Sequence, residues 1–361
     1  MINVPASTRE VTAEWLTEVL RSTGRLKSSV TDVGIEPIGA GVGLMGELAR
    51  LYLSYSNEES LPSTMVVKCA IQNENRQVAQ TLDFYNREAD FYNRVAEDCP
   101  LRLPTSYYAD VNQDTYDFVL LMEDLGDVSP RDQLVGASKH EVFTAVAAIA
   151  GMHIKWWGVS EADHPWMYDF MGAGEAVRLR DMIYLPALEQ ALDEFSYIVS
   201  DDMKSLCRRV GEHFVPLWSE QMTPFDTFVH GDYRQDNMLY TDDQPDALVM
   251  DWQISGRGKG VFDIAYFMCQ SVASELRAEI ERDVLQHYVA SLAEAAIDYS
   301  FENCWNDYRQ VILGCLIYPI TVCGSLDTAN ERGRALGECM LSRNLAAIED
   351  HGSVELIPAS A

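Results

Sequence analysis

The sequence predicts a two-lobed α+β fold, in which an antiparallel sheet with a helix precedes a mainly helical half. Strand-like runs separated by turn residues lie between residues 30 and 122. Long runs with helical apolar spacing follow residues 123–126. A chain of 361 residues has the length of two domains or one large bilobal unit. We therefore expect an N-terminal lobe at 1–124 and a C-terminal lobe at 125–361.

The first lobe opens with the segment Ser7–Glu10, whose serine and glutamate have the spacing of a capping box before a helix. The helix is expected to end near Gly24. The elements predicted for this lobe are a helix over 8–23, strands over 30–37, 47–55 and 64–70, a polar helix over 75–96, and strands over 107–110 and 118–122. Five strands and a long helix make an antiparallel sheet with one covered face.

The second lobe reads as helix with one short β-rich segment. The clearest helix covers 139–157, where apolar residues and His153 share one face. Residues 174–223 predict more helix, with Pro186 and Pro216 as interruptions. Strands are expected within 227–253, and helices return from residue 262 to the end.

The composition excludes several classes of partner. Hydrophobic residues make up 47% of the chain, which is enough for a large core. The formal net charge of −29 argues against DNA, RNA or an anionic membrane as the main partner, because their phosphates repel an acidic surface. Such a surface attracts cationic substrates, although its more common effect is solubility.

The cysteines and the N-terminus indicate where the protein works. The eight cysteines form no C-x-x-C pair, and most lie in apolar surroundings, as Cys269 and Cys315 do. The N-terminus lacks the basic and apolar regions of a signal peptide. No apolar stretch approaches the roughly 18 residues that a membrane helix needs. We expect a reduced, cytoplasmic protein without a membrane span.

The strongest chemical signal is the run FVHGDYRQDN at 228–237, which is followed by LVMDWQ at 248–253. Its H-x-D-x-x-x-x-N spacing places Asp232 and Asn237 in one loop, and Asp251 ends the next apolar run. Phosphoryl transfer requires a carboxylate that deprotonates the attacking hydroxyl and oxygen ligands that hold magnesium against the nucleotide phosphates. We therefore predict Asp232 as the catalytic base, and Asn237 and Asp251 as magnesium ligands.

Two upstream residues complete this chemistry in the expected order. Lys68 lies near the end of the strand 64–70, where it is suited to binding the α- and β-phosphates of a nucleotide. Glu88 lies on the following helix, where it can pair with Lys68. Four other acidic residues on or near this helix compete for that role: Glu74, Asp83, Asp90 and Glu97.

A glycine-rich segment, IGAGVGLMGE at 38–47, lies between the first two strands. Glycines allow backbone amides to approach phosphates closely. Gly41 and Gly43 are therefore predicted to cover the nucleotide phosphates. The alternative is that these glycines, with Gly39, only form a flexible hairpin.

The opening helix and the motifs MEDLGD, HGDYRQDN and MDWQ resemble the aminoglycoside phosphotransferase and choline kinase superfamily, a branch of the protein-kinase-like fold. Within it the chain resembles the ecdysteroid kinase-like section. The resemblance covers about residues 8 to 350. It implies binding of ATP near the lobe junction, with Glu123 and Leu125 among the nucleotide-binding residues. It also implies Mg²⁺ and a hydroxylated small molecule as acceptor, either sterol-like or antibiotic-like.

Departures from the protein kinases bear on the acceptor. His-Gly-Asp at 230–232 replaces their His-Arg-Asp, Asp-Trp-Gln at 251–253 replaces Asp-Phe-Gly, and no Ala-Pro-Glu segment follows. These differences favour a small-molecule kinase over a protein kinase. A nucleotide-binding pseudokinase that acts as a scaffold is the other alternative. It is disfavoured because all four residues of the predicted machinery are present: Lys68, Asp232, Asn237 and Asp251.

Several nearby residues have two interpretations. His230 is expected to be a buried imidazole that shapes its loop. Asp263 either caps a helix or braces the catalytic loop, as the resemblance implies. Arg257 and Lys259 either contact phosphate or lie on a solvated loop. His153, beside two tryptophans, is expected to belong to a helix-packing stripe rather than an aromatic cage.

Overall fold

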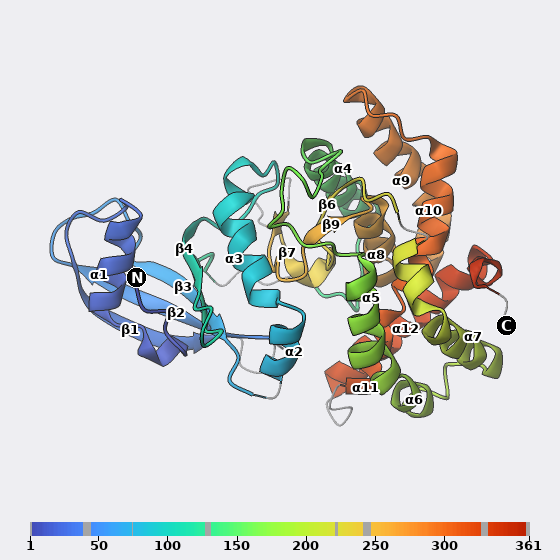
Figure 1. The fold of residues 1–361 in the computed structure, drawn as a ribbon, viewed down its shortest axis with the longest axis horizontal. Coiled ribbons are helices and arrows are strands. Elements are labelled where there is room, and N and C mark those ends of the chain that lie inside the picture. Colours follow the sequence, from blue (N-terminus) through green and yellow to red (C-terminus); the bar gives the residue numbers. More distant parts are fainter. Residues whose placement is uncertain are drawn as a thin grey trace. The chain divides into compact units, whose positions relative to one another are not determined.

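The structure is a computed structural model that describes residues 2–38, 45–73, 75–126, 131–220, 223–240, 247–325 and 331–358 (Figure 1). The chain forms two compact units. The first comprises Met1–Cys99, Leu103–Val128 and Met250–Ile254, and the second comprises Pro100–Arg102, Ser129–Val249 and Ser255–Ala361. Each unit is described by itself below.

The first unit contains a five-stranded antiparallel sheet with the order β1-β2-β3-β5-β4, as the sequence predicts. Its strands are β1 (Val30–Ile38), β2 (Gly46–Tyr55), β3 (Thr64–Ala70), β4 (Ser106–Val111) and β5 (Phe118–Glu123). The central strand β3 is buried at six of its seven residues, and its Lys68 pairs with Leu48 on one side and Leu120 on the other. The sheet therefore holds Lys68 on a backbone fixed from both sides.

The N-terminal helix begins later than predicted. Thr8–Glu10 forms one 3-10 turn (η1), and α1 covers Ala13–Ser22. Ser7 makes no capping hydrogen bond, whereas the hydroxyl of Thr12 accepts one from the backbone N–H of Trp15 at 3.1 Å. The capping-box prediction was wrong because Thr12 provides a cap directly before the amphipathic run. The apolar face of α1 joins the core of the sheet through Trp15, Leu16, Val19 and Leu20.

The polar helix predicted over 75–96 is broken. It consists of α2 (Asn75–Thr81) and α3 (Phe84–Arg94), followed by the 3-10 turn η2 (Ala96–Asp98). Asp83 lies between them with φ of 57°, a left-handed conformation that aspartate tolerates better than most residues. Its carboxylate accepts a hydrogen bond from Asn86 at 2.7 Å, which stabilises the turn.

In the second unit, α4 (Lys139–Lys155) begins with a capping box formed by Ser138 and Glu141. Its predicted apolar face is buried and includes His153. The imidazole of His153 bonds to Tyr288 at 3.0 Å and to Asp263 at 3.2 Å. This confirms that His153 belongs to the buried face, although the helix ends at Lys155, two residues earlier than predicted.

The helical run after residue 172 differs from the prediction at its prolines. α5 (Ala173–Leu179) continues through a π-helical turn, η3 (Arg180–Tyr184), into α6 (Leu185–Glu194). Pro186 does not end the run, because the chain stays helical on both sides of it, and the π-helical turn η3 lies directly before α6. The break comes instead at 195–200, and α7 (Asp201–Glu212) follows. Pro216 opens the π-helical turn η4 (Pro216–Glu220).

Two small two-stranded sheets frame the catalytic motif. β6 (Thr227–Val229) pairs with β9 (Gly256–Gly258), and β7 (Met238–Leu239) pairs with β8 (Leu248–Val249). The 3-10 turn η5 (Gln235–Asn237) lies directly before β7. The loop 230–234 is thus held between β6 and η5.

The remaining helices build the core of the second unit (Figure 1). They are α8 (Val261–Ser271), α9 (Ser274–Glu294), α10 (Phe301–Gly314), α11 (Ile317–Ser325) and α12 (Glu331–Asp350), followed by the 3-10 turn η6 (Ser353–Leu356). Every residue of α8 is buried, and this helix contacts α4, α9, α10 and α12. Among the described residues no helix combines the length and apolar character required to cross a bilayer.

Candidate active site

In the first unit, Lys68 forms the predicted ion pair with Glu88. Its Nζ donates to the two carboxylate oxygens of Glu88 at 2.8 and 2.9 Å, and to Oδ1 of Asp251 at 3.1 Å. Lys68 is only 8% exposed and Glu88 is buried on α3. The structure thus pairs Lys68 with Glu88 rather than with Asp83, Asp90 or Glu97, and Glu74 lies outside the described residues.

The position of Lys68 depends on the small residue beside it. Gly46, at the start of β2, has no side chain, and a Cβ there would lie 2.9 Å from Cε of Lys68 and 3.2 Å from its Cγ. Carbon atoms at those separations overlap. The absence of a side chain at Gly46, in the glycine-rich segment, therefore leaves room for the side chain of Lys68.

Burial and neighbouring charge act in opposite directions on this pair. Burial lowers the pKa of Lys68, but the carboxylates of Asp251 and Glu88 outweigh it and hold the pKa above its usual value. Burial raises the pKa of Glu88, against the opposing effect of the Lys68 ammonium. Lys68 therefore stays cationic at neutral pH, as phosphate binding requires.

Asp251 belongs to the first unit, although it lies far along the chain from Lys68. It has φ of 65°, a left-handed conformation that is uncommon for a residue other than glycine and is often found at functional sites. Gln253 donates to its Oδ2 at 3.3 Å. The next residue, Trp252, is fully buried and stacks on Phe91 of α3 with ring centroids 3.7 Å apart.

In the second unit, Asp232 is surrounded by donors. Oδ1 accepts a hydrogen bond from the hydroxyl of Tyr266 at 2.7 Å, and Oδ2 accepts one from Nδ2 of Asn237 at 2.9 Å. Nε of Arg234 also lies 3.1 Å from Oδ1, as an ion pair. The carboxylate predicted as catalytic base is thus held in one orientation.

Asp263 stabilises the loop 230–234 through hydrogen bonds. Of its two predicted roles, helix cap or support of this loop, the structure shows the second. Its Oδ2 accepts from the backbone N–H of His230 at 2.8 Å, and its Oδ1 accepts from that of Gly231 at 2.9 Å. Gly231 has φ of 83°, a conformation that favours glycine. His230 is fully buried, and its Nδ1 accepts from the backbone N–H of Asp232 at 3.1 Å. The imidazole therefore shapes the loop, as expected.

The two predicted metal ligands offer oxygen atoms of the kind that magnesium prefers. Nδ2 of Asn237 donates to both the carbonyl and Oδ2 of Asp232, which directs its amide oxygen to other partners. The side chain of Asp251 is 30% exposed and carries a carboxylate. The chemistry of both residues fits a magnesium ion. In the described part of the chain, no cluster of three or more His, Cys, Asp or Glu side chains forms another metal centre.

Other predicted nucleotide-binding residues are placed only in part. Gly39, Gly41 and Gly43 lie outside the described residues. Glu123, at the end of β5, accepts a hydrogen bond through its carboxylate from the backbone N–H of Thr105 at 3.0 Å. Leu125 is partly exposed.

The predictions for Arg257 and Lys259 were both wrong. Arg257 is buried and pairs through its Nε with Oδ1 of Asp169 at 2.7 Å. Lys259 is buried and its Nζ donates to Oδ2 of Asp307 at 3.0 Å. These cations stabilise the second unit internally, and neither is on a solvated loop or free for phosphate.

Comparisons with known proteins bear on the fold. A sequence model of the ecdysteroid kinase-like family matches residues 176–300. A complex of APH(2″)-IIIa with GDP and kanamycin is similar over 94% of this chain and 98% of its own, with 12% identity and a TM-score of 0.50. The choline kinase LicA from Streptococcus pneumoniae is similar over 93% and 98%, with 16% identity and a TM-score of 0.50.

A protein from Ralstonia eutropha, assigned to the aminoglycoside phosphotransferases, is similar over 95% of this chain and 99% of its own, with 13% identity and a TM-score of 0.52. No curated protein matches the sequence significantly. The chain has the protein-kinase-like fold of the aminoglycoside phosphotransferases and choline kinases. The ecdysteroid kinase-like match over residues 176–300 agrees with the predicted resemblance, and the solved structures confirm the predicted fold.

Two tyrosines contact the loop 230–234 in ways that the sequence does not predict. Tyr266 donates to Asp232, and the hydroxyl of Tyr318 donates to the backbone carbonyl of Gly231. Their rings pack with centroids 4.1 Å apart. Tyr266 lies one helical turn after Asp263, so the helical period could have indicated that it faces the same loop. No local signal identifies Tyr318.

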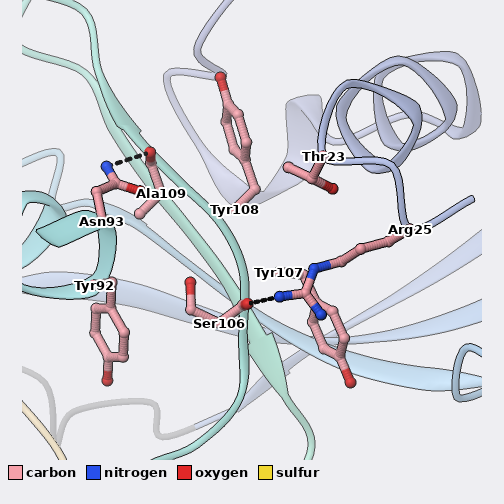
Figure 2. Close-up of a pocket in the computed structure, with 8 residues that line it drawn as sticks. All are labelled: Thr23, Arg25, Tyr92, Asn93, Ser106, Tyr107, Tyr108 and Ala109. Atoms are coloured by element: carbon pink, nitrogen blue, oxygen red, sulfur yellow. Dashed lines mark hydrogen bonds between the residues drawn. The ribbon is translucent and has the colours of Figure 1, made fainter. Parts of the chain in front are cut away.

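A hollow of about 350 Å³ in the first unit is lined by residues of α3, of β4 and of the segment after α1 (Figure 2). Arg25 spans part of it, where its Nη2 donates to the carbonyl of Ser106 and its guanidinium lies 5.2 Å from the ring of Tyr107. Asn93 of α3 donates to the carbonyl of Ala109 on β4. These contacts join α3 and the segment after α1 to β4.

Proposed function

We propose that this protein is an ATP-dependent small-molecule kinase, which transfers the γ-phosphoryl group of ATP to a hydroxyl of its acceptor. The observation that carries the proposal is the buried ammonium of Lys68, which bonds to Glu88 and Asp251 together. A structural ion pair needs only one carboxylate. The second carboxylate, on a strained residue with a partly exposed side chain, is the group that a nucleotide-bound metal requires.

Each residue has a distinct role in this proposal. Lys68, oriented by Glu88, binds the α- and β-phosphates of ATP, with Gly41 and Gly43 as backbone contacts to the phosphates and Glu123 and Leu125 near the base. Asp232 orients the acceptor hydroxyl and accepts its proton.

Magnesium would be held by Asn237 and Asp251. When bound, the ion neutralises the charge of the phosphate oxygens during transfer. The oxygen donors of both residues suit this hard cation better than a softer transition metal.

The names of two proteins with this fold support a small hydroxylated acceptor. One is a choline kinase, and the other was solved with GDP and kanamycin. We propose an antibiotic-like or sterol-like alcohol as the acceptor of this chain. Because that complex contains GDP, we infer that this chain also binds a nucleotide, and we propose ATP.

The proposed location is the cytoplasm. All eight cysteines are free, and six of them are buried. Burial raises the pKa of the Cys207 thiol to about 12 and that of Cys323 to about 12, so these groups are unreactive at neutral pH. Such cysteines are compatible with a reducing compartment.

The test is an ATP-consumption screen across a library of alcohols, with a thermal-shift measurement in Mg·ATP. The proposal expects stabilisation by Mg·ATP, slow ADP release with water as acceptor, and much faster release with at least one alcohol. Nucleotide binding without any ADP release would instead support a pseudokinase scaffold. Phosphorylation confined to a peptide library would support a protein kinase.

A further inference from the structure

The two carboxylate oxygens of Asp232 have different surroundings. Oδ1 accepts from the hydroxyl of Tyr266 at 2.7 Å and lies 3.1 Å from Nε of Arg234. Oδ2 accepts from Nδ2 of Asn237 at 2.9 Å. Each carboxylate oxygen can accept about two hydrogen bonds. Oδ1 is therefore engaged on two sides, whereas Oδ2 has Asn237 as its donor in the described part of the chain and can accept one more hydrogen bond.

The donor on Oδ1 is unusually well fixed. Tyr266 lies on α8, the wholly buried helix of the second unit. Its ring packs against that of Tyr318, whose own hydroxyl holds the carbonyl of Gly231 in the same loop. One helical turn before Tyr266, Asp263 holds two backbone N–H groups of that loop. α8 thus determines both the path of the loop and the orientation of the Asp232 carboxylate.

Tyr266 can only donate to Asp232 in this setting. Burial, reinforced by the negative charge of Asp232, raises the pKa of Tyr266 well above its usual value. The phenol therefore stays protonated and keeps its hydrogen on the carboxylate. A hydrogen bond to a charged acceptor is stronger than one between neutral groups.

On the basis of the proposed function, we propose that Tyr266 is a positioning residue for phosphoryl transfer. By donating to Oδ1, it fixes the carboxylate of Asp232 so that Oδ2 receives the proton of the acceptor hydroxyl. Tyr266 touches neither acceptor nor nucleotide in this role. It acts through Asp232.

The acceptor O–H bond breaks, and its proton moves to Oδ2 of Asp232. The acceptor oxygen forms a bond to the γ-phosphorus, while the bond from that phosphorus to the β–γ bridging oxygen breaks. The bridging oxygen leaves with the bonding electron pair as part of ADP. Tyr266 remains protonated throughout.

The test compares two tyrosine-to-phenylalanine variants of the full chain. Tyr266→Phe removes the donor to Asp232 and leaves the ring in place. Tyr299→Phe is the matched control, because its hydroxyl also donates to a carboxylate at 2.7 Å, that of Asp307. ADP release from Mg·ATP is measured first with water as acceptor and then with any alcohol that the screen identifies.

The proposal expects kcat to fall about tenfold or more in Tyr266→Phe, the equivalent of one hydrogen bond to a charged group. The KM for ATP should stay within about twofold of the wild type. Tyr299→Phe should match the wild type in both parameters. A normal kcat in folded Tyr266→Phe would overturn the proposal, and so would an equal loss in Tyr299→Phe.

Two further variants of the chain complete the test. Placing para-aminophenylalanine at position 266 retains a donor, so it should restore most of the activity even if Tyr266→Phe fails to fold. A folded protein of this kind with low kcat would contradict the proposal.

Asp232→Asn distinguishes a failure of the role proposed for Tyr266 from a failure of the proposed function. If Asp232→Asn is inactive while Tyr266→Phe is normal, only the role of Tyr266 fails, whereas an active Asp232→Asn removes the proposed base itself.

Discussion

Trp252 stacks on Phe91 with ring centroids 3.7 Å apart and ring planes 4° from parallel. Phe91 lies on α3 one turn after Glu88, and Trp252 directly follows Asp251. The stack thus joins the segment that carries Asp251, a proposed metal ligand, to helix α3, which carries Glu88, the partner of Lys68. Lys68 closes this arrangement by bonding to both Glu88 and Asp251.

Removing the stack should therefore loosen Asp251 as well as the core. We expect Trp252→Ala to destabilise the protein by about 3–5 kcal/mol, because it deletes a large buried side chain. The affinity for Mg·ATP should fall as well. We expect Trp252→Phe to retain most of the stability and most of the affinity. Urea unfolding and titration with a fluorescent ATP analogue measure the two effects. Unchanged affinity in a folded Trp252→Ala protein would show that Asp251 does not need the stack.

Gly46 should be required for its small size. In Gly46→Ala the new Cβ would meet the side chain of Lys68, which its ion pairs prevent from moving freely. Overpacking costs roughly 1–3 kcal/mol, so we expect Mg·ATP binding to weaken about tenfold. Gly34→Ala on β1 is the matched control, because its nearest contact would be an ordinary 3.5 Å. Equal affinities in the two variants would exclude this steric role.

The metal ligands should differ in their contributions. We expect Asp251→Ala to abolish magnesium-dependent nucleotide binding and Asn237→Ala to weaken it less, because a carboxylate binds a hard dication better than an amide does. Titration of Mg²⁺ at a fixed concentration of fluorescent ATP analogue checks this. Wild-type magnesium dependence in both variants would disprove the proposed ligands.

The sequence predicted the sheet, and the closeness of Asp232 to Asn237, because those signals are local. Strand 64–70 was right at both ends, since a buried apolar run has sharp boundaries. Asp232 and Asn237 lie in one loop, so their spacing alone placed them together. Glu88 could be singled out because it lies on the helix that follows the strand of Lys68.

Features that depend on tertiary packing were missed. The break at Asp83 is compensated by bonds to Asn86 and Tyr116, which no helix propensity describes. Arg257 and Lys259 look like solvated loop residues, yet their partners Asp169 and Asp307 lie far away in sequence. Long-range pairings of this kind leave no trace in residue spacing.

Asp226 should make stability depend on pH. Burial raises the pKa of its carboxyl to about 6, from a usual value near 4, so the folded state binds a proton more tightly than the unfolded state. The contribution of this carboxyl group to the free energy of unfolding is therefore full at low pH and falls as pH rises from about 4 to 6.

Asn at this position can still accept the hydrogen bond from Gly260 N–H. We expect Asp226→Asn to be about 1–2 kcal/mol more stable than the wild type at pH 7 and no more stable at pH 4, as urea unfolding would show. A gain that is equal at both pH values would contradict this account.

Asp232→Asn tests most directly whether Asp232 is the base of a phosphoryl transfer. A base acts in the transition state more than in nucleotide binding, so we expect kcat for the best alcohol acceptor to fall by about 10²- to 10⁴-fold. Mg·ATP affinity should remain nearly that of the wild type. The measurement is the rate of ADP release at saturating acceptor, alongside a direct ATP-binding titration of the same protein. A kcat close to that of the wild type would contradict the account.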